Sequence, residues 1–232
     1  RFFYAIFKKI FNYVQATDVP EIQIPRYFFV LKNTKVGHHY RFKAIVGQGS
    51  FGVVHRVVHK ISGHERVCKS IPKGSASIPA SQLEAEIRII AQLDHMNVIR
   101  IFEYFDDDTH VHLILENCKS GDLLGMIKES TKSHKPLELD LIRSLVKQIL
   151  AALAFMTSHR IIHKDLKPEN VMLIKSENSR FPLVKIIDFG LSEMFLPDQN
   201  TSSTVAGTAF YMAPEIFRPP FTYNCDVWSC GV

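Results

Sequence analysis

The chain has 232 residues, of which 46% are hydrophobic and 22% are charged, which is the composition of a globular protein with one large core or two small ones. Disordered and fibrous classes are therefore excluded. The net charge of +5 comes from residues 1–47, which hold eight Lys and Arg against two Asp and Glu, whereas residues 48–232 hold 20 against 21. Because most of the chain is balanced in charge, the sequence does not support a nucleic-acid partner.

The first 39 residues form an extension that precedes the predicted catalytic domain. Residues 1–14 are rich in Phe, Tyr and Ile around Lys8 and Lys9. They fit an amphipathic helix that rests on a membrane or a partner, or a helix that packs on its own domain, and we favour the second alternative. Residues 18–39 contain Pro20 and Pro25, which predicts a linker or a wrapping extension.

No apolar run approaches the ~20 residues of a membrane-spanning helix. The cysteines form no C-x-x-C pair and are scattered through apolar segments, at Cys68, Cys118, Cys225 and Cys230. This pattern fits free thiols in a reducing compartment. We expect the protein to be cytoplasmic, with membrane association if residues 1–14 rest on a lipid surface.

Hydrophobic patterning predicts an α+β protein. Residues with β-branched side chains form two short runs at 53–58 and 65–71, and two more strand-like runs follow at 101–105 and 110–115. Apolar residues at helical spacing predict one helix over 81–93 and a long buried helix over 139–156. The sequence therefore predicts a small sheet with one helix, followed by a helical region.

A glycine-rich loop lies at the start of the predicted sheet. Gly47, Gly49 and Gly52 stand where a backbone turns sharply and approaches phosphates without a Cβ in the way. A dinucleotide-binding turn has the same glycine spacing but opens a helix, whereas strand formers follow this loop. We therefore predict a strand-loop-strand that covers a nucleotide, built from Val46, Gly47, Gln48, Gly49, Ser50, Phe51 and Gly52.

A lysine follows in the next predicted strand. The ammonium group of Lys69 could reach the α- and β-phosphates of ATP, although a single lysine on a strand is more often a solvated surface group. Glu86, in the predicted helix, could pair with Lys69 and hold it toward the nucleotide. Glu84 lies nearby as an alternative, and Glu86 is preferred because its register before residues 87–90 resembles that of the family named below.

Residues 163–170 and 188–190 contain the groups that phosphoryl transfer needs. Asp165 could orient the attacking hydroxyl and accept its proton, and Lys167 could neutralise charge on the migrating phosphoryl group. Asn170 and Asp188 offer hard oxygen ligands for Mg²⁺. We predict ATP and Mg²⁺ as the cofactors of this site.

These motifs resemble those of eukaryotic protein kinases, and the resemblance runs from about Tyr40 to Val232. It implies a bilobal kinase fold, with a small antiparallel sheet and one main helix in an N-lobe at 40–118. A mainly helical C-lobe at 119–232 would be truncated at its end, and we expect low activity of the isolated chain for that reason. Residues 207–215 resemble the segment that closes the activation loop, and Asp226 resembles the aspartate that fixes the backbone of the catalytic loop.

Lys167 and Thr208 resemble their counterparts in serine/threonine kinases, so protein serine and threonine hydroxyls are the expected acceptors. Residues 65–71, 93–95 and 223–229 resemble the calcium/calmodulin-regulated group, and calcium-dependent protein kinases most closely. No EF-hand loop occurs in the sequence. A calcium sensor is therefore expected only by analogy with this group.

The same resemblance implies an adenine pocket and a substrate-docking surface. The backbone of the linker residues Glu116, Asn117 and Cys118 would hydrogen-bond adenine, and Leu115 would guard the deeper pocket. The side chains around the ring would be Val54, Val67 and Met172. For Val54, Val67 and Met172, ordinary core packing is an alternative that is compatible with this role. Asp122 and Glu169 could attract basic residues of the substrate, or act as helix caps.

Thr204 lies four residues before Thr208, where many kinases accept an activating phosphate, and Thr201, Ser202 and Ser203 are alternative sites in the same loop. That phosphate would pair with the residue before the catalytic aspartate, which is Lys164 in place of the usual arginine. Lysine lacks the bidentate fork, so control by phosphate is expected to be weak, and an unmodified polar loop is the alternative. A noncatalytic kinase-like module is the alternative function, but Lys69, Asp165 and Asp188 together favour an enzyme.

Overall fold

The computed structural model describes residues 30–32, 34–49, 52–73, 86–87, 89–90, 92–175, 177–195 and 199–232. The described residues form two compact units. The N-terminal unit comprises those of Pro25–Asp94 and Ile99–Asn117, and the C-terminal unit comprises those of His95–Val98 and Cys118–Val232. The predicted helix at 1–14 and the loop residues Ser50 and Phe51 lie outside the described residues.

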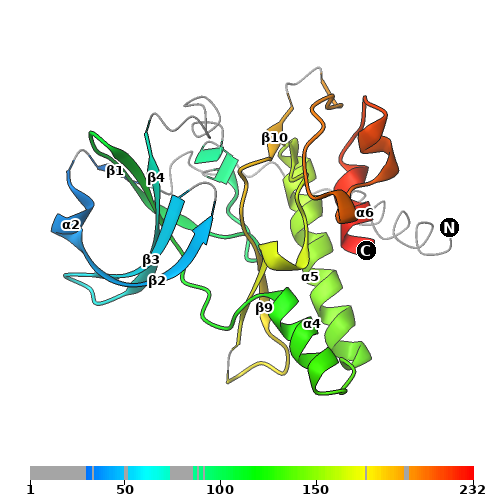
Figure 1. The fold of residues 1–232 in the computed structure, drawn as a ribbon, viewed down its shortest axis with the longest axis horizontal. Coiled ribbons are helices and arrows are strands. Elements are labelled where there is room, and N and C mark those ends of the chain that lie inside the picture. Colours follow the sequence, from blue (N-terminus) through cyan, green and yellow to red (C-terminus); the bar gives the residue numbers. More distant parts are fainter. Residues whose placement is uncertain are drawn as a thin grey trace. The chain divides into compact units, whose positions relative to one another are not determined.

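A six-stranded sheet dominates the N-terminal unit, in the order β1-β5-β6-β4-β3-β2 (Figure 1). All pairs are antiparallel except β1 with β5. The four predicted strand runs are confirmed, and each extends by at most two residues. The strands are β1 (Val30–Lys32), β2 (Tyr40–Gly49), β3 (Gly52–His59), β4 (Glu65–Pro72), β5 (Ile101–Asp106) and β6 (His110–Leu115). Of the predicted helix over 81–93, residues 86–87, 89–90 and 92 are helical.

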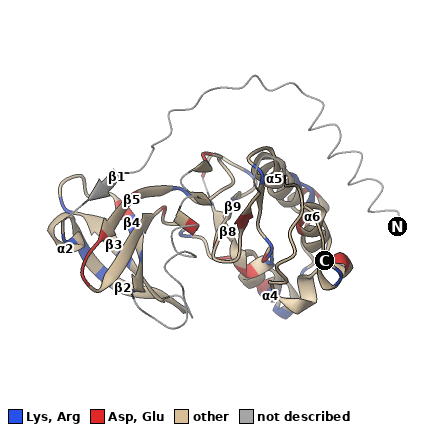
Figure 2. Ribbon diagram, turned by 90° about the horizontal axis from the view of Figure 1, so that it is seen from above, with Lys and Arg blue, Asp and Glu red and all other residues tan. Residues whose placement is uncertain are grey.

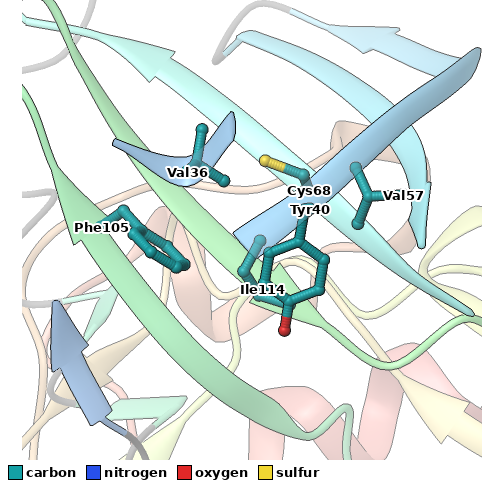
Figure 3. Close-up of a cluster of buried hydrophobic side chains, with 6 residues drawn as sticks. All are labelled: Val36, Tyr40, Val57, Cys68, Phe105 and Ile114. Atoms are coloured by element: carbon teal, nitrogen blue, oxygen red, sulfur yellow. The ribbon is translucent and has the colours of Figure 1, made fainter. Parts of the chain in front are cut away.

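The strand register separates the side chains of the sheet into two faces. Cys68 lies opposite Ile114, and both are fully buried with Val57 and Phe105 on one face. Figure 3 shows this cluster, in which the ring of Tyr40 stands edge-on to Phe105 at 6.1 Å. Because side chains alternate along a strand, the residues next to Cys68 point to the opposite face.

Ordered structure begins before Tyr40, where the sequence left a linker and a wrapping extension as alternatives. Strand β1 adds to the sheet beside β5, with Leu31 opposite Tyr104. The short helix α2 (Val36–His39) follows, and the side chain of Val36 is buried in the cluster of Figure 3. Residues 30–32 and 34–39 thus pair or pack with the sheet, while residues 18–29 and 33 of the predicted linker or extension lie outside the described residues.

The C-terminal unit is built around the helix α5 (Leu139–Ser158). Its buried residues recur at helical spacing, at Leu145, Ile149, Ala152, Leu153 and Met156. The prediction of a long helix here is confirmed, and its burial is confined to the face that these residues form, because Leu139 is 60% exposed. The other helices are α4 (Leu123–Lys132), α6 (Asn224–Gly231) and the 3₁₀ turns η1 (Pro168–Asn170), η2 (Ala209–Tyr211) and η3 (Pro214–Phe217).

Short strands of the C-terminal unit carry the loops with the predicted catalytic residues. Two antiparallel pairs join β7 (Ile161–Ile162) to β10 (Glu193–Met194) and β8 (Val171–Ile174) to β9 (Leu183–Ile186). The loop between β7 and η1 contains Asp165, and the loop after β9 contains Asp188. Two-residue strands have little local signal, which explains why the sequence did not predict β7 and β10.

Residues 95–98 belong to the C-terminal unit, although the prediction placed them in the N-terminal part of the domain. The side-chain amide of Asn97 donates to Gln148 Oε1 on α5 and to the carbonyl of Val184 on β9, each at 2.9 Å. Val98 also forms a parallel bridge with Ile186. These buried polar contacts fix the segment to α5 and β9.

Basic and acidic residues are interspersed along the ribbon in each unit (Figure 2). This mixture agrees with the even charge balance of residues 48–232. None of the helices in the described ranges combines the length and the apolar character that a membrane span requires.

We predict that Val36→Ala lowers the free energy of unfolding by about 1–3 kcal/mol, because it leaves a cavity in the cluster of Figure 3. Chemical denaturation would measure this change. The matched control is Ile61→Ala, whose side chain is 91% exposed and whose loss should leave stability unchanged. Equal stabilities of the two variants would show that residues before Tyr40 are not part of the core.

Candidate functional site

A buried aspartate fixes the backbone of the predicted catalytic loop. Asp226, on α6, accepts hydrogen bonds from the backbone N–H groups of His163 at 2.7 Å and of Lys164 at 2.9 Å. Burial raises the pKa of this carboxyl, and the two backbone hydrogen bonds and nearby positive charge oppose that rise. The structure thus brings together Asp226 and the loop as the sequence predicted.

Asp165 lies at the centre of a hydrogen-bond network. Its Oδ2 accepts from Lys167 Nζ at 2.7 Å and from Asn170 Nδ2 at 3.1 Å. Its Oδ1 accepts from the hydroxyl of Thr208 at 2.6 Å, and that hydroxyl accepts from Lys167 Nζ at 2.9 Å. Three of the four residues were predicted site residues, and the network fixes the direction in which the carboxylate points.

This network keeps Asp165 ionised. Burial alone would raise the pKa of Asp165, but the hydrogen bonds from Lys167 and Thr208, with the charge of Lys167, lower it below its ordinary value. The depressed pKa means that the stability contributed by the carboxylate is present above its unfolded pKa and is lost as the pH falls through the folded pKa. At neutral pH the group is therefore an anion that can orient a hydroxyl.

Thr208 has a role that the sequence did not identify. The sequence indicated it only as a residue typical of serine/threonine kinases. In the structure its hydroxyl accepts a hydrogen bond from Lys167 and donates one to Asp165. Its position depends on Gly207, whose φ is +127° and where a Cβ would lie 2.5 Å from the carbonyl oxygen of Lys164. Only glycine lets the two segments approach so closely.

His163 connects the catalytic loop to the segment that contains Asp188. Its Nε2 donates to the carbonyl of Ile187 at 3.1 Å, and its Nδ1 accepts from the N–H of Asp165 at 3.3 Å. These partners assign the proton to Nε2. The imidazole also stands edge-on to Phe189 at 5.1 Å. The loops of Asp165 and Asp188 are therefore held by one buried ring.

Asn170 and Asp188 are the predicted ligands of a divalent cation. The Nδ2 of Asn170 makes both of its contacts with Asp165, which directs the amide oxygen away from that residue. The N–H of Ile187 donates to the carbonyl of Asn170 at 2.9 Å and ties the two segments together. One amide oxygen and one carboxylate fit Mg²⁺, which takes few protein ligands and completes its shell with phosphates and water.

The described residues contain no group of three or more His, Cys, Asp or Glu side chains that could hold a metal. A dedicated protein cage is therefore not found in this part of the chain. Asp188 and Lys164 both have positive φ, at 63° and 67°, without lying at the end of a helix. Non-glycine residues in this conformation cluster at functional sites.

In the N-terminal unit, Lys69 and Glu86 form the predicted ion pair. Lys69 Nζ lies 2.7 Å from Glu86 Oε1, and the two side chains are 14% and 6% exposed. This contact selects Glu86 over Glu84 as the partner. The pair holds the ammonium group on the face of the sheet opposite to the cluster of Figure 3.

The predicted adenine-contacting residues of the sheet share that face with Lys69. Val54 lies opposite Lys69, and Val67 lies opposite Leu115, in adjacent strands. Residues directly opposite each other point to the same side of a sheet. Val54 and Val67, which were predicted to contact adenine, and Leu115, which was predicted to guard the pocket, thus share one face of the sheet with the predicted phosphate-binding lysine.

The glycine-rich loop is described in part. Gly47 and Gly49 end β2, paired with Val54 and Gly52, while Gln48 and Val46 are exposed. Gly52 has a φ of +134°, and a Cβ there would lie 2.1 Å from the carbonyl oxygen of Ser70. The third glycine is therefore required by the approach of β3 to β4, in addition to its predicted role near phosphates.

The remaining predicted residues lie at the edges of their units. The N–H of Glu116 donates to the carbonyl of Arg100 at 2.9 Å, and Cys118 is half-buried. Asp122 caps α4 through the N–H of Gly125 at 2.6 Å and forms a bridge with Met172 on β8. Of the two alternatives for Asp122, the cap is observed. Glu169 is exposed in η1.

Comparison with known families gives a match to the protein kinase domain over residues 40–232. Similar proteins include calcium-dependent protein kinase 6 of Plasmodium berghei (strain Anka), with 38% identity over 199 residues, which is 86% of this chain and 13% of the relative. Calcium-dependent protein kinase 4 of Plasmodium falciparum (isolate 3D7) is 33% identical over 210 residues, which is 90% of this chain and 39% of the relative.

A probable myosin light chain kinase of Dictyostelium discoideum is 34% identical over 203 residues, which is 87% of this chain and 50% of the relative. The chain thus spans from 13% to 50% of the length of these three relatives. The matched region contains every predicted catalytic residue.

We predict that Thr208→Val raises the pKa of Asp165, because it removes a hydrogen bond to the ionised carboxylate. The acidic limb of a pH profile of kcat should therefore move to higher pH, and kcat should fall by about ten-fold or more. Thr208→Ser keeps the hydroxyl and serves as the control. A pH profile of Thr208→Val that matches the wild type would show that the Thr208 hydroxyl does not affect the pKa of Asp165.

We predict that Gly207→Ala lowers the free energy of unfolding by about 1–3 kcal/mol through the contact with Lys164 O. Gly63→Ala is the matched control, because Gly63 also has a positive φ, of +71°, but no heavy atom lies within 4 Å of its built Cβ. Thermal unfolding would measure the stability loss of both variants. The loss in Gly63→Ala reports backbone strain alone, and the additional loss in Gly207→Ala reports the contact with the Lys164 carbonyl. Equal losses in the two variants would show that the approach to Lys164 costs nothing.

Proposed function

This chain belongs to the protein kinase domain family, and on that premise we propose that it transfers the γ-phosphoryl group of ATP to serine or threonine hydroxyls of proteins. The observation that carries the proposal is the network in which Lys167, Asn170 and Thr208 all bond to the Asp165 carboxylate. Phosphoryl transfer needs a positioned anion beside the attacking hydroxyl, rather than a covalent nucleophile. Asp165 meets that requirement.

In the proposed step, the acceptor hydroxyl attacks the γ-phosphorus, a new O–P bond forms, and the bond to the β–γ bridging oxygen breaks. The hydroxyl proton passes to an oxygen of Asp165, and ADP leaves with the bridging electrons. Lys167 faces both Asp165 and Thr208 and supplies positive charge beside the acceptor. Mg²⁺, when bound, neutralises charge on the phosphates.

Each unit contributes a charged group that the reaction requires. Lys69 is held by Glu86 and would neutralise the α- and β-phosphates. Asn170 and Asp188 would hold Mg²⁺, and the backbone bond between Ile187 and Asn170 keeps their segments together. We propose that, in the N-terminal unit, Val54 and Val67 contact adenine beside Lys69 while Leu115 guards the deeper pocket.

Serine and threonine are the proposed acceptors because Lys167 and Thr208 match that class, and the relatives include calcium-dependent protein kinases and a probable myosin light chain kinase. Calcium control is proposed only by analogy with the relatives' names. A preference for basic substrates through Glu169 rests on its exposed carboxylate beside the catalytic loop. The four free cysteines support a cytoplasmic protein.

Phosphate transfer from radiolabelled ATP by the full-length protein, beside its Asp165→Asn variant, tests the proposal. The amide keeps the size of the side chain but cannot accept the proton, so kcat should fall by about 10²–10⁴-fold. ATP binding should change little, and the unfolding temperature should fall modestly because the variant loses the ion pair with Lys167. Equal rates for the two proteins would exclude Asp165 as the base, and no transfer by the wild type would favour a noncatalytic module.

A further inference from the structure

Lys164 precedes the proposed base, and its side chain takes no part in the network around Asp165. The side chain is only 2% exposed, and its Nζ donates to Glu193 Oε2. Glu193 begins β10 and lies in register with Ile162 of β7, the strand just before the catalytic loop, so this strand pairing holds the contact in place. The sequence predicted that Lys164 would pair with a phosphate on the loop, whereas the structure pairs it with a carboxylate of the chain.

The same oxygen of Glu193 contacts the loop that was predicted to carry the phosphate. The hydroxyl of Ser202 donates to Glu193 Oε2 at 2.7 Å, and Ser202 is fully buried. Ser202 is also paired through its backbone with Phe221, at 2.8 and 3.0 Å, and its Oγ accepts from the N–H of Thr204 at 3.2 Å. One carboxylate thus joins the catalytic loop to the loop at 199–205.

We infer that Glu193 is a positioning residue that supplies to Lys164 the negative charge otherwise expected from a loop phosphate. The carboxylate would hold the loop at 199–205 against the catalytic loop without any modification. Thr204 is exposed, and a phosphate there would find Lys164 already paired. The inference rests on the proposed kinase function, because its effect is exerted on Asp165.

The chemistry of Lys164 favours this arrangement. An ammonium group is a compact charge that one carboxylate oxygen can satisfy, whereas a guanidinium group presents a fork that suits a phosphate. The Glu193 side chain is 29% exposed, but the Lys164 side chain is only 2% exposed, so loss of this carboxylate would leave a buried ammonium group without compensating charge, which is destabilising. Glu193 is therefore coupled to the conformation of Lys164.

Lys164 transmits this constraint to the proposed base. Its backbone N–H is bonded to Asp226, its φ is 67°, and its carbonyl oxygen faces Gly207. Asp165 follows directly in the chain. A displacement of Lys164 would therefore move the Asp165 carboxylate. It would also disturb the close contact of Gly207 with the Lys164 carbonyl, which places Thr208 beside Asp165.

The test uses the full-length protein after treatment with a phosphatase, with mass spectrometry to verify that residues 199–208 carry no phosphate. Steady-state kcat and KM are measured for the wild type, Glu193→Gln, Thr204→Ala and the charge-exchanged double variant Lys164→Glu/Glu193→Lys. We expect the treated wild type and Thr204→Ala to keep kcat within about two-fold of the untreated wild type. Glu193→Gln should lose about ten-fold or more in kcat with little change in KM for ATP, and the double variant should recover part of that loss.

Hydrogen exchange at residues 199–205 gives a second result that does not depend on activity. Glu193→Gln should exchange faster there than the wild type, while exchange at α5, which is distant in sequence, should stay the same. If Asp165→Asn equals the wild type, the proposed function fails and the exchange result still decides the inference. The inference is overturned if the phosphatase abolishes wild-type activity, or if Glu193→Gln matches the wild type in kcat and in exchange.

Discussion

The buried carboxylate of Asp226 is the constraint on which the candidate site depends. It fixes two consecutive backbone N–H groups, those of His163 and Lys164, with bonds of 2.7 and 2.9 Å. Burial of this group is costly, as its raised pKa indicates, so the hydrogen bonds must offset the loss of solvation. These two hydrogen bonds hold the backbone of the catalytic loop in one conformation.

Three consecutive residues of that loop, His163, Lys164 and Asp165, make side-chain contacts with other segments. His163 holds the segment of Asp188 through Ile187 and Phe189, Lys164 contacts Glu193, and Asp165 collects the bonds from Lys167, Asn170 and Thr208. Each of these side chains takes its direction from the fixed backbone. A catalyst that works mainly by position and charge needs this rigidity before substrate arrives.

The charged groups of the site form ion pairs with one another in the absence of substrate. Lys69 is paired with Glu86, Lys167 with Asp165, and Lys164 with Glu193. Each pair lies within one unit, so each can form as that unit folds. Within each pair, the opposite charge keeps an ammonium group in place at a partly or fully desolvated position.

The sequence predicted well what depends on local pattern or on a family motif. The β-branched runs at 53–58 and 65–71 became β3 and β4, and the choice of Glu86 over Glu84 was confirmed by its contact with Lys69. It missed β1 and α2, because Pro25 and mixed residues hide a strand whose partner, β5, lies about 70 residues later.

The contacts that the sequence missed in the site are long-range and involve common residues. Nothing near Glu193 in the chain indicates that it meets Lys164, 29 residues away, or Ser202. The sequence indicated Thr208 only as a residue typical of serine/threonine kinases. Its hydrogen bond to Asp165 joins residues 43 positions apart, which the sequence could not predict. Gly52 was assigned to phosphates, whereas its conformation is also required by the carbonyl of Ser70, which only the paired strands reveal.

The central proposal is that the segments held by the fixed catalytic loop, those of Asn170 and Asp188, bind the metal ion of the nucleotide. Mn²⁺ can replace Mg²⁺ at oxygen ligands and broadens NMR signals of nuclei near it. We expect Mn²⁺ with ATP to broaden the backbone amide signals of Asn170 and Asp188 at the same low metal concentration. Broadening by Mn²⁺ with ATP that spares both residues, or that reaches only one of them, would contradict the proposal.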